Sequence, residues 1–370
     1  MIVVAEPTYH DHEHAPVNGA ILHSIALACG PVVFAATPLH HASVREAASL
    51  NAPIPTRHDI VVLPSGGIHV RRMRAQWLAL AGLMRTYAPH TLVLLSAGPE
   101  TLFVARVLVT RYRKLHLFVV THGNLVTATG WRSRDPRHRL IDMRSSLAVA
   151  RHPRIHLIVL ETHIRESARR IGLPHNFLVW PHPLPTHEVV PFTPWVFNPR
   201  LRLAFVGQGT KPKGFDDFLA MYRSVGPKYD WALVGKLDPN YNAIDLGVID
   251  FSYVQLSRAE FLSELRKADF AVLSLRADYD FIASGSLLDC IAQRKPLIAV
   301  ETTMLAGLTR QYGQFGYLCP DLPAVEALLA DPARLRDPAA YAKFQRVLDA
   351  MHHDRAPETL AIMLRRDLQC

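Results

Sequence analysis

The sequence predicts an α/β protein built from two Rossmann-like domains, each a parallel sheet covered by helices. Its 370 residues exceed what one domain usually needs and suit two. Short β-branched runs alternate with longer helical patterns at spacings of roughly 25–40 residues, as βα units require. A proline-rich stretch without helical periodicity, "WPHPLPTHEVVPFTPWVFNPR" at 180–200, separates two series of such units.

Buried strands are expected where a β-branched, apolar run is short and a helical pattern follows it. In the first half these runs lie at 1–5, 31–36, 60–63, 92–95, 116–121, 156–160 and 177–180. In the second half they lie at 202–206, 231–234, 270–274 and 297–300. Helical patterns over 339–351 and 357–367 complete the chain, and we expect the final helix to pack back on the first domain.

The predicted boundaries are a first domain at residues 1–183, a linker at 184–200 and a second domain at 201–370. We expect the two domains to face each other across a cleft. In parallel α/β sheets, ligands bind at loops beyond the carboxyl ends of the strands. The loops that follow the strands are therefore the candidate sites.

Composition narrows the class of protein. Charged residues make up 20% of the chain, which is ordinary for a folded protein. No apolar run reaches the ~18 residues of a membrane span, and the N-terminus does not resemble a signal peptide. The formal charge of +9 indicates anionic partners, either substrates, lipid or nucleic acid. The cysteines lack CxxC spacing, so we expect buried, reduced thiols in a cytoplasmic protein: Cys29, Cys290, Cys319 and Cys370.

The loop after strand 202–206 is the first candidate binding site. Glycine allows close approach of the backbone, and amides at a helix N-terminus favour anionic oxygens. A lysine on the same loop adds positive charge, so the pattern predicts a phosphate site. The alternative is a plain βα turn with solvated lysines. The residues concerned are Gly207, Gln208, Gly209, Lys211, Lys213 and Gly214.

A second candidate follows strand 270–274. Ser284, Gly285 and Ser286 open a helix and offer amides and hydroxyls at its positive end. Asp289 lies three residues after Ser286, on the same helical face. A carboxylate there can accept hydrogen bonds from a ribose diol while the helix start holds phosphate. The alternative is that the serines only cap the helix and Asp289 only complements its dipole.

Together the two stretches resemble the nucleotide-sugar-binding domain of GT-B glycosyltransferases, especially the retaining family 4-like group. That family shows Val-Gly-Arg, four residues, then Lys-Gly, with the arginine and lysine on the donor diphosphate. Here the motif is Val206-Gly207-Gln208, then Lys213-Gly214. The resemblance implies that Lys213 binds the diphosphate, and Lys211 is the candidate to replace the missing arginine.

The family's second motif is an acid, seven residues, and a second acid that binds the ribose. Asp289 stands at the second place, with a shorter side chain than glutamate. Phe281 stands at the first place, beside Asp280, which becomes the candidate for contact with the donor. These departures describe a divergent member of the group.

The first half then supplies the acceptor side. "THGNL" at 121–125 ends a strand with His122, which resembles the histidine that such enzymes place against the donor sugar or its phosphates. It can donate a hydrogen bond when neutral or offset charge when protonated; the alternative is a capping residue. In the loop after the first strand, Glu6, Asp11 and Glu13 are candidates to orient or deprotonate an acceptor hydroxyl.

The same loop leaves two alternatives open. His10, His12 and His14 alternate in a way that can bind a transition metal, although no second ligand cluster follows in the sequence. A solvated polar loop is the other alternative.

Two basic stretches, 69–85 and 130–154, accompany apolar, aromatic-bearing helices and suit an anionic membrane surface. A core-packed helix with solvated arginines is the alternative for the first. No recognisable nucleic-acid-binding module accompanies them.

We therefore expect a metal-independent hexosyltransferase-like enzyme without a cofactor, whose donor is a nucleotide sugar and whose acceptor is a glycan or a lipid pyrophosphate. The resemblance implies surface polysaccharide synthesis, cytoplasmic or peripheral on the inner face of the membrane, and retention of configuration. An inverting enzyme would take its base from the 6–13 loop. The alternatives are a non-catalytic GT-B-like subunit, a metal-dependent hydrolase using His10, His12 and His14, and a sugar-nucleotide epimerase.

Overall fold

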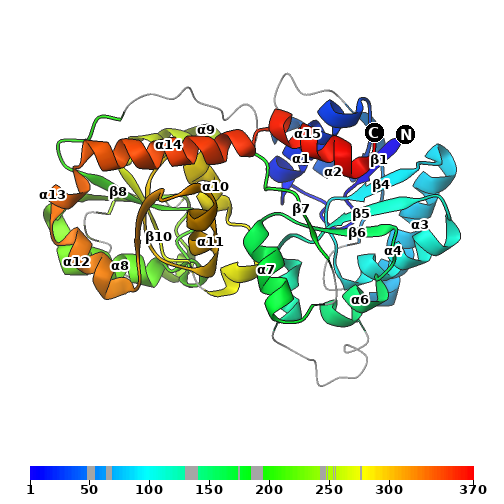
Figure 1. The fold of residues 1–370 in the computed structure, drawn as a ribbon, viewed down its shortest axis with the longest axis horizontal. Coiled ribbons are helices and arrows are strands. Elements are labelled where there is room, and N and C mark those ends of the chain that lie inside the picture. The colour runs from blue at the N-terminus through cyan, green and yellow to red at the C-terminus, as the bar shows by residue number, and fades with distance from the viewer. Residues whose placement is uncertain are drawn as a thin grey trace. The chain divides into compact units, whose positions relative to one another are not determined.

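The computed structural model divides into two compact units (Figure 1). The first unit comprises Met1–His187, Phe281–Ala283 and Asp354–Cys370, and the second comprises Glu188–Asp280 and Ser284–His353. The chain therefore leaves the first unit and returns to it before it ends. The structure describes residues 1–47, 55–63, 69–129, 141–173, 176–184, 195–241, 247, 249–252, 254, 256–275 and 277–370.

Within its described residues, the first unit holds a seven-stranded parallel sheet in the order β3-β2-β1-β4-β5-β6-β7. The central strands are apolar and buried on both faces, which is typical of a parallel sheet covered by helices. The elements are β1 (Ile2–Ala5), α1 (Ala15–Cys29), β2 (Val33–Ala36), α2 (Pro38–Ala47), β3 (Thr56–Asp59), α3 (His69–Tyr87), β4 (Thr91–Leu94), α4 (Pro99–Arg111), β5 (His116–Val120), the 3-10 helix η1 (His122–Ala128), α6 (Met143–Val149), β6 (Ile155–Val159), α7 (Thr162–Arg170), β7 (Leu178–Val179) and α15 (Pro357–Leu368).

The described part of the second unit holds a five-stranded parallel sheet in the order β12-β11-β10-β8-β9. Because β8 and β10 are neighbours, the loops that follow them leave the same edge of the sheet. The elements are β8 (Arg202–Val206), η3 (Lys211–Lys213), α8 (Phe215–Val225), η4 (Gly226–Lys228), β9 (Asp230–Val234), η5 (Pro239–Tyr241), α9 (Arg258–Lys267), β10 (Phe270–Leu273), η6 (Ala277–Phe281), α10 (Gly285–Ala292), β11 (Leu297–Val300), α11 (Thr303–Tyr312), β12 (Gly316–Cys319), α12 (Leu322–Leu329), α13 (Pro332–Leu335) and α14 (Pro338–Asp354).

The prediction of two parallel α/β sheets is confirmed, but two strands differ from expectation. The strand expected at 60–63 lies at Thr56–Asp59, where polar residues pair with β2 at the sheet edge. Edge strands in soluble proteins are often short and charged, so apolar pattern misses them. β12 is a strand that the sequence does not predict, because its first residue is a glycine, which weakens the strand pattern. The glycine avoids a clash with the neighbouring strand, since a Cβ on Gly316 would lie 2.3 Å from the Leu297 carbonyl oxygen. Among the helices of the described residues, none has the length and apolar character to cross a membrane.

A buried carboxylate, Asp269, organises the start of the second unit. It accepts hydrogen bonds from the indole of Trp195 at 2.8 Å, from the backbone and side chain of Asn198, and from the Arg202 amide at 2.7 Å. Lys295 is also buried; its Nζ lies 3.5 Å from the Trp195 ring centroid and donates to the Ala268 carbonyl. Burial lowers the pKa of Lys295 to about 7.

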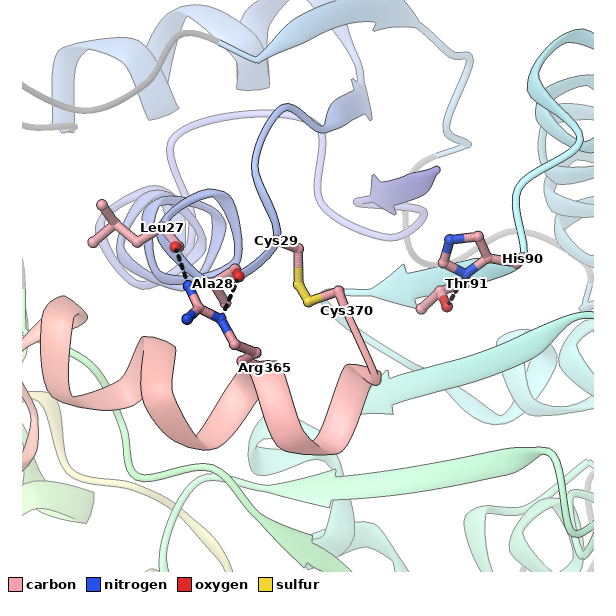
Figure 2. The surroundings of a disulfide bond; sticks show 7 residues. All are labelled: Leu27, Ala28, Cys29, His90, Thr91, Arg365 and Cys370. Atoms are coloured by element: carbon pink, nitrogen blue, oxygen red, sulfur yellow. Dashed lines mark hydrogen bonds between the residues drawn. A yellow bond between two sulfur atoms is a disulfide. The ribbon is translucent and has the colours of Figure 1, made fainter.

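The last helix, α15, packs on α1 in the first unit (Figure 1). Cys370 forms a disulfide with Cys29, the last residue of α1, and Arg365 donates to the Ala28 carbonyl beside it (Figure 2). The expectation of four reduced thiols is wrong for Cys29 and Cys370. The two residues lie far apart in the sequence, so no sequence spacing reveals that they are close in the structure. Cys290 and Cys319 are free. The cysteines therefore do not support a cytoplasmic location.

Replacing Asp269 with asparagine is expected to destabilise the second unit by about 3 kcal/mol, because the new NH₂ group faces donors that need an acceptor. Denaturant unfolding measures the change. The control is Asp230→Asn, which removes an exposed ion pair with Arg200 and should cost less than about 1 kcal/mol. Equal effects of the two variants would contradict the organising role of Asp269.

Breaking the disulfide is expected to lower the stability of the first unit by about 3 kcal/mol, because the unfolded chain loses a long-range constraint. Cys370→Ser tests this by thermal unfolding with and without reductant, and only the unmodified chain should respond to the reductant. Thiol titration of the denatured, unreduced chain should find two thiols, those of Cys290 and Cys319. Four thiols would show that the bond does not form.

Candidate functional site

The loop after β8 and the start of α10 meet at Gly207. This glycine has φ +104°, and a Cβ on it would lie 2.5 Å from Ser286 Oγ and 3.3 Å from Lys213 Nζ. Any side chain at this position would displace one of the two polar groups. The structure thus brings together three residues that the sequence predicts for one site: Gly207, Lys213 and Ser286.

A second glycine sets the path of the same loop. Gly214 follows η3 with φ +79°, and a Cβ there would lie 2.1 Å from the carbonyl oxygen of Ser274, which follows β10. The close approach of the two loops therefore requires glycine. Lys213, just before it, is half-buried. Burial lowers the pKa of Lys213, and the negative charge of Asp289 opposes that shift.

The helix α10 begins with a capped N-terminus. Ser284 is buried, and its hydroxyl accepts a hydrogen bond from the Leu287 amide at 3.3 Å. Gly285 is exposed at the first helical position, and Ser286 is buried beside Gly207. The cap fixes where the helix starts, and the start of a helix attracts anions.

Asp289, one turn into α10, forms an ion pair that the sequence does not predict. Arg258 Nη2 lies 2.6 Å from Asp289 Oδ1. Arg258 is the first residue of α9, after the N-cap Ser257. The capping pattern that starts α9 is visible in the sequence, but nothing in it reveals a contact with a carboxylate 31 positions away.

The other predicted donor-site residues are Gln208, Lys211 and Asp280. The Gln208 side chain is exposed. Lys211 is 73% exposed at its side chain, and its Nζ lies 3.9 Å from Asp216 Oδ2. Asp280 lies in η6 and is half-buried. Phe281 belongs to the first unit and is buried in its core, where a carboxylate would be costly.

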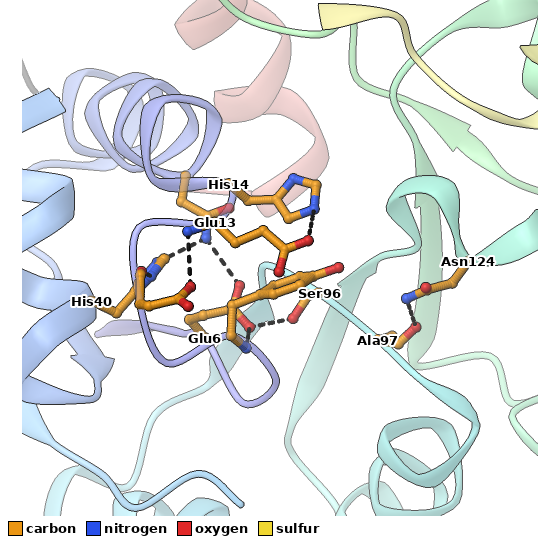
Figure 3. Close-up of polar contacts among 10 residues, drawn as sticks. Glu6, Glu13, His14, His40, Ser96, Ala97 and Asn124 are labelled. Atoms are coloured by element: carbon orange, nitrogen blue, oxygen red, sulfur yellow. Dashed lines mark hydrogen bonds and ion pairs between the residues drawn. The ribbon is translucent and has the colours of Figure 1, made fainter. Parts of the chain in front are cut away.

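In the first unit, Glu6 is the centre of a buried hydrogen-bond network (Figure 3). Its carboxylate accepts from the amides of Thr8 at 2.9 Å and Tyr9 at 3.1 Å, from Asn18 Nδ2 at 3.0 Å, and from the Ser96 hydroxyl. Burial raises the pKa of Glu6. With four donors around it and no exposed surface, Glu6 shapes the loop rather than meeting an acceptor hydroxyl.

The network continues to His40 and back to the loop. Asn18 Nδ2 lies 3.0 Å from His40 Nε2, and His40 Nδ1 lies 2.5 Å from the Asp11 carbonyl oxygen. Because that oxygen only accepts, His40 carries its proton on Nδ1 and accepts from Asn18 through Nε2. The loop after β1 is therefore held at Glu6, where it begins, and again at Asp11.

The other two candidate acids lie nearer the surface. Asp11 is half-buried, and the Glu13 amide donates to its Oδ1 at 3.0 Å, which lowers the pKa of Asp11. Glu13 is 62% exposed at its side chain, and its Oε1 lies 3.9 Å from His14 Nε2 (Figure 3). Of the three predicted acids, only Glu6 is fully buried, while Asp11 and Glu13 are at least partly exposed to solvent.

His14 and His122 form a pair of rings at the carboxyl edge of the first sheet. Their centroids lie 4.6 Å apart, and the Tyr9 ring lies 4.4 Å from that of His14. Both histidines have left-handed backbones, with φ of 60° at His14 and 36° at His122. Such conformations are strained for a side chain other than glycine and concentrate at functional sites.

The protonation state of His122 follows from its partners. The Leu95 backbone carbonyl faces the ring, and Nε2 is buried without a partner among the residues that the structure describes. A neutral ring that donates to this carbonyl from Nδ1 leaves Nε2 as an acceptor. Burial, then His14 and His182, hold the pKa of His122 well below 6.5. Burial lowers the pKa of His14 to about 4 and that of His182 to about 3. All three imidazoles are therefore neutral near pH 7.

The histidines of the first loop do not converge as metal ligands. His10 and His12 are exposed, while His14 packs against Tyr9 and His122. Across the described ranges, no group of three or more His, Cys, Asp or Glu side chains is arranged to hold a metal ion.

Comparison with solved structures identifies the fold. Sucrose-phosphate synthase from Thermosynechococcus elongatus matches with a TM-score of 0.68 at 14% identity, over 100% of this chain and 98% of its own. Anabaena HepE in complex with UDP gives 0.68 at 12%, over 100% and 99%. The calicheamicin glycosyltransferase CalG4 gives 0.56 at 16%, over 99% and 98%. The chain thus has the GT-B fold of these glycosyltransferases. No protein-family model and no curated protein sequence matches it.

Acid is expected to destabilise the first unit because of its neutral histidines. The lowered pKa of His122 means that, below pH 6.5, the unfolded chain binds a proton that the folded chain does not. Stability therefore falls as the pH drops, by about 1.4 kcal/mol per pH unit for each such group. His122→Gln should reduce this slope of stability against pH by the contribution of one group. His12→Gln, which changes an exposed ring, should leave the slope unchanged. Denaturant unfolding between pH ~7 and ~5 measures the free energy of unfolding of each variant. Parallel curves of this free energy against pH for the unmodified chain and His122→Gln would contradict the prediction.

Proposed function

We propose that the protein is a glycosyltransferase that moves a sugar from a nucleoside-diphosphate sugar to a hydroxyl of a glycan or lipid-linked acceptor. The observation that carries the proposal is the meeting of Gly207, Lys213 and Ser286 at the carboxyl edge of the second sheet. A cation, a hydroxyl and a helix N-terminus around a glycine suit a diphosphate. The GT-B neighbour HepE was crystallised with UDP and with UDP-glucose, which supports a donor of this class.

The second unit would stabilise the leaving group. As the bond from the anomeric carbon to the diphosphate oxygen breaks, negative charge grows on that oxygen. Lys213 and the amides at the start of α10 are fixed before the reaction, so they stabilise this charge without rearranging. In this proposal they do the work that a divalent ion does in other transferases. Asp289, one turn further along α10, would accept hydrogen bonds from the ribose.

The first unit would contact the sugar through His122. The sequence leaves open whether this residue binds sugar or phosphate. Within the described part of the chain, Nε2 of the neutral His122 ring is buried and has no partner. Such an acceptor suits a sugar hydroxyl, which can donate to it, and not a phosphate, which cannot. We therefore assign His122 to the donor sugar.

The stereochemical course is proposed from the resemblance as retention. The environment of Glu6 removes it from the candidates for a general base, because its oxygens already accept four hydrogen bonds in a fully buried site. If the enzyme inverts, the base is Asp11 or Glu13, the acids of the same loop that retain access.

The acceptor side would lie against an anionic membrane surface, as surface polysaccharide synthesis requires. On α3, Val70 and Leu78 are 66% and 53% exposed, on a helix that also exposes Arg71 and Arg74. Apolar and basic side chains on one exposed helix favour an anionic interface. Part of the second basic stretch, 130–140, lies outside the described residues. A cytoplasmic, inner-face location stays a prediction.

A non-catalytic subunit is the second candidate. Two observations favour it: Gln208 is exposed where the family has its arginine, and Phe281 is buried in the first-unit core where the family has an acid. Such a subunit would bind donor weakly and would neither transfer nor hydrolyse it.

Thermal stabilisation by a panel of UDP, GDP, ADP, CDP and dTDP tests the proposal. One of them is expected to raise the unfolding midpoint, because a ligand that binds only the folded chain stabilises it. Lys213→Ala should weaken that binding by about 10- to 100-fold, the worth of a hydrogen bond to a charged group. Lys267→Ala, on the exposed surface of α9, should have no effect. Stabilisation by none of the diphosphates, or an unchanged response of Lys213→Ala, would refute the proposal.

A further inference from the structure

Arg258 occupies a fixed position that stability alone does not explain. Ser257 caps α9 by accepting from the Glu260 amide, and the Glu260 carboxylate accepts from the Ser257 amide at 2.8 Å. This capping box places Arg258 at the first helical position. A positive side chain there is unfavourable with the helix dipole, which prefers an anion at this end.

The Arg258 guanidinium is nevertheless held in one orientation. Nη2 donates to Asp289 Oδ1 at 2.6 Å, and the guanidinium carbon lies 5.2 Å from the centroid of the Phe261 ring. Its side chain remains 41% exposed, whereas that of Asp289 is 16% exposed. An ion pair with one exposed partner contributes little to folding. The pair therefore orients the Asp289 carboxylate, while part of the Arg258 side chain stays exposed.

The position of Asp289 relative to Lys213 and Ser286 indicates what the Arg258–Asp289 pair does. Ser286 lies with Lys213 beside Gly207. Asp289 follows Ser286 by three residues, which places it about 4.5 Å further along the helix axis. Arg258 therefore contacts α10 beyond the residues that would bind the diphosphate, toward the part of the ligand that follows the phosphates.

We propose that Arg258 is the positioning residue for the nucleoside of the donor. It fixes the Asp289 carboxylate for the ribose hydroxyls, and its partly exposed side chain lines the place where the nucleoside lies. Arg258 does not replace the arginine that the family has at the position of Gln208. This inference rests on the proposed function. In it, Arg258 contacts the nucleoside of the donor, whereas Lys213 binds its phosphates.

The test separates the two ends of the ligand. Binding of UDP and UMP, GDP and GMP, ADP and AMP, CDP and CMP, and dTDP and dTMP is measured by calorimetry for the unmodified chain, Arg258→Ala, Arg258→Lys and Lys213→Ala. Arg258→Ala is expected to weaken the mono- and diphosphate of the preferred pair by the same factor, about 10-fold. Lys213→Ala should weaken the diphosphate far more than the monophosphate. Arg258→Lys should recover part of the loss, because it keeps the charge without the planar fork.

Two further measurements exclude a merely structural role. Arg258→Ala should reduce the preference for the ribonucleotide over its 2′-deoxy form, because Asp289 is no longer oriented. Without ligand, its unfolding midpoint should stay within about 2 °C of the unmodified chain. Arg266→Ala, an exposed arginine at the other end of α9, is the matched control and should change neither quantity.

The outcomes are distinguishable. A loss confined to the diphosphate would make Arg258 a phosphate ligand and overturn the inference. Unchanged binding in Arg258→Ala would reduce the Asp289 contact to a surface ion pair and overturn it as well. If the unmodified chain binds no member of any pair, the proposed function itself fails, and the inference fails with it.

Discussion

The candidate donor site depends on the absence of two Cβ atoms. Gly207 and Gly214 have left-handed backbones, and a methyl group on either would collide with the loop or helix that follows β10. Because β8 and β10 are adjacent in the sheet, these glycines allow the two following segments to touch. That contact places a lysine beside a capped helix N-terminus. The proposed roles of Lys213, Ser286 and Asp289 in donor binding all presuppose it.

The first unit uses a different device at the corresponding edge of its sheet. A buried carboxylate, Glu6, is surrounded by donors from its own loop, from α1 and from the segment after β4. This network fixes the loop that carries His14, whose ring packs against His122. The unit therefore presents uncharged imidazoles where the second unit presents a cation.

Sequence reasoning succeeds where local patterns and the order of strands in a sheet determine the structure. The two parallel sheets follow from apolar runs and their spacing, and the convergence of Gly207, Lys213 and Ser286 follows from strand adjacency at one sheet edge. It fails where the outcome depends on distant partners. The Arg258–Asp289 pair, the buried place of Phe281 in the first-unit core, and the saturation of Glu6 all arise from contacts between segments that no local pattern records. Residue type and loop position favour Lys211 as a phosphate ligand, but only coordinates could show that it turns to Asp216.

The cystine between Cys29 and Cys370 has a topological effect beyond its energy. The two residues are separated by 341 positions, so the bond closes nearly the whole polypeptide into one macrocycle. The second unit, Glu188–Asp280 with Ser284–His353, lies entirely inside this ring. A single backbone nick within the ring opens it but releases nothing. A protease must therefore cut twice, or a reductant must act first, before any piece of that unit can separate from the rest.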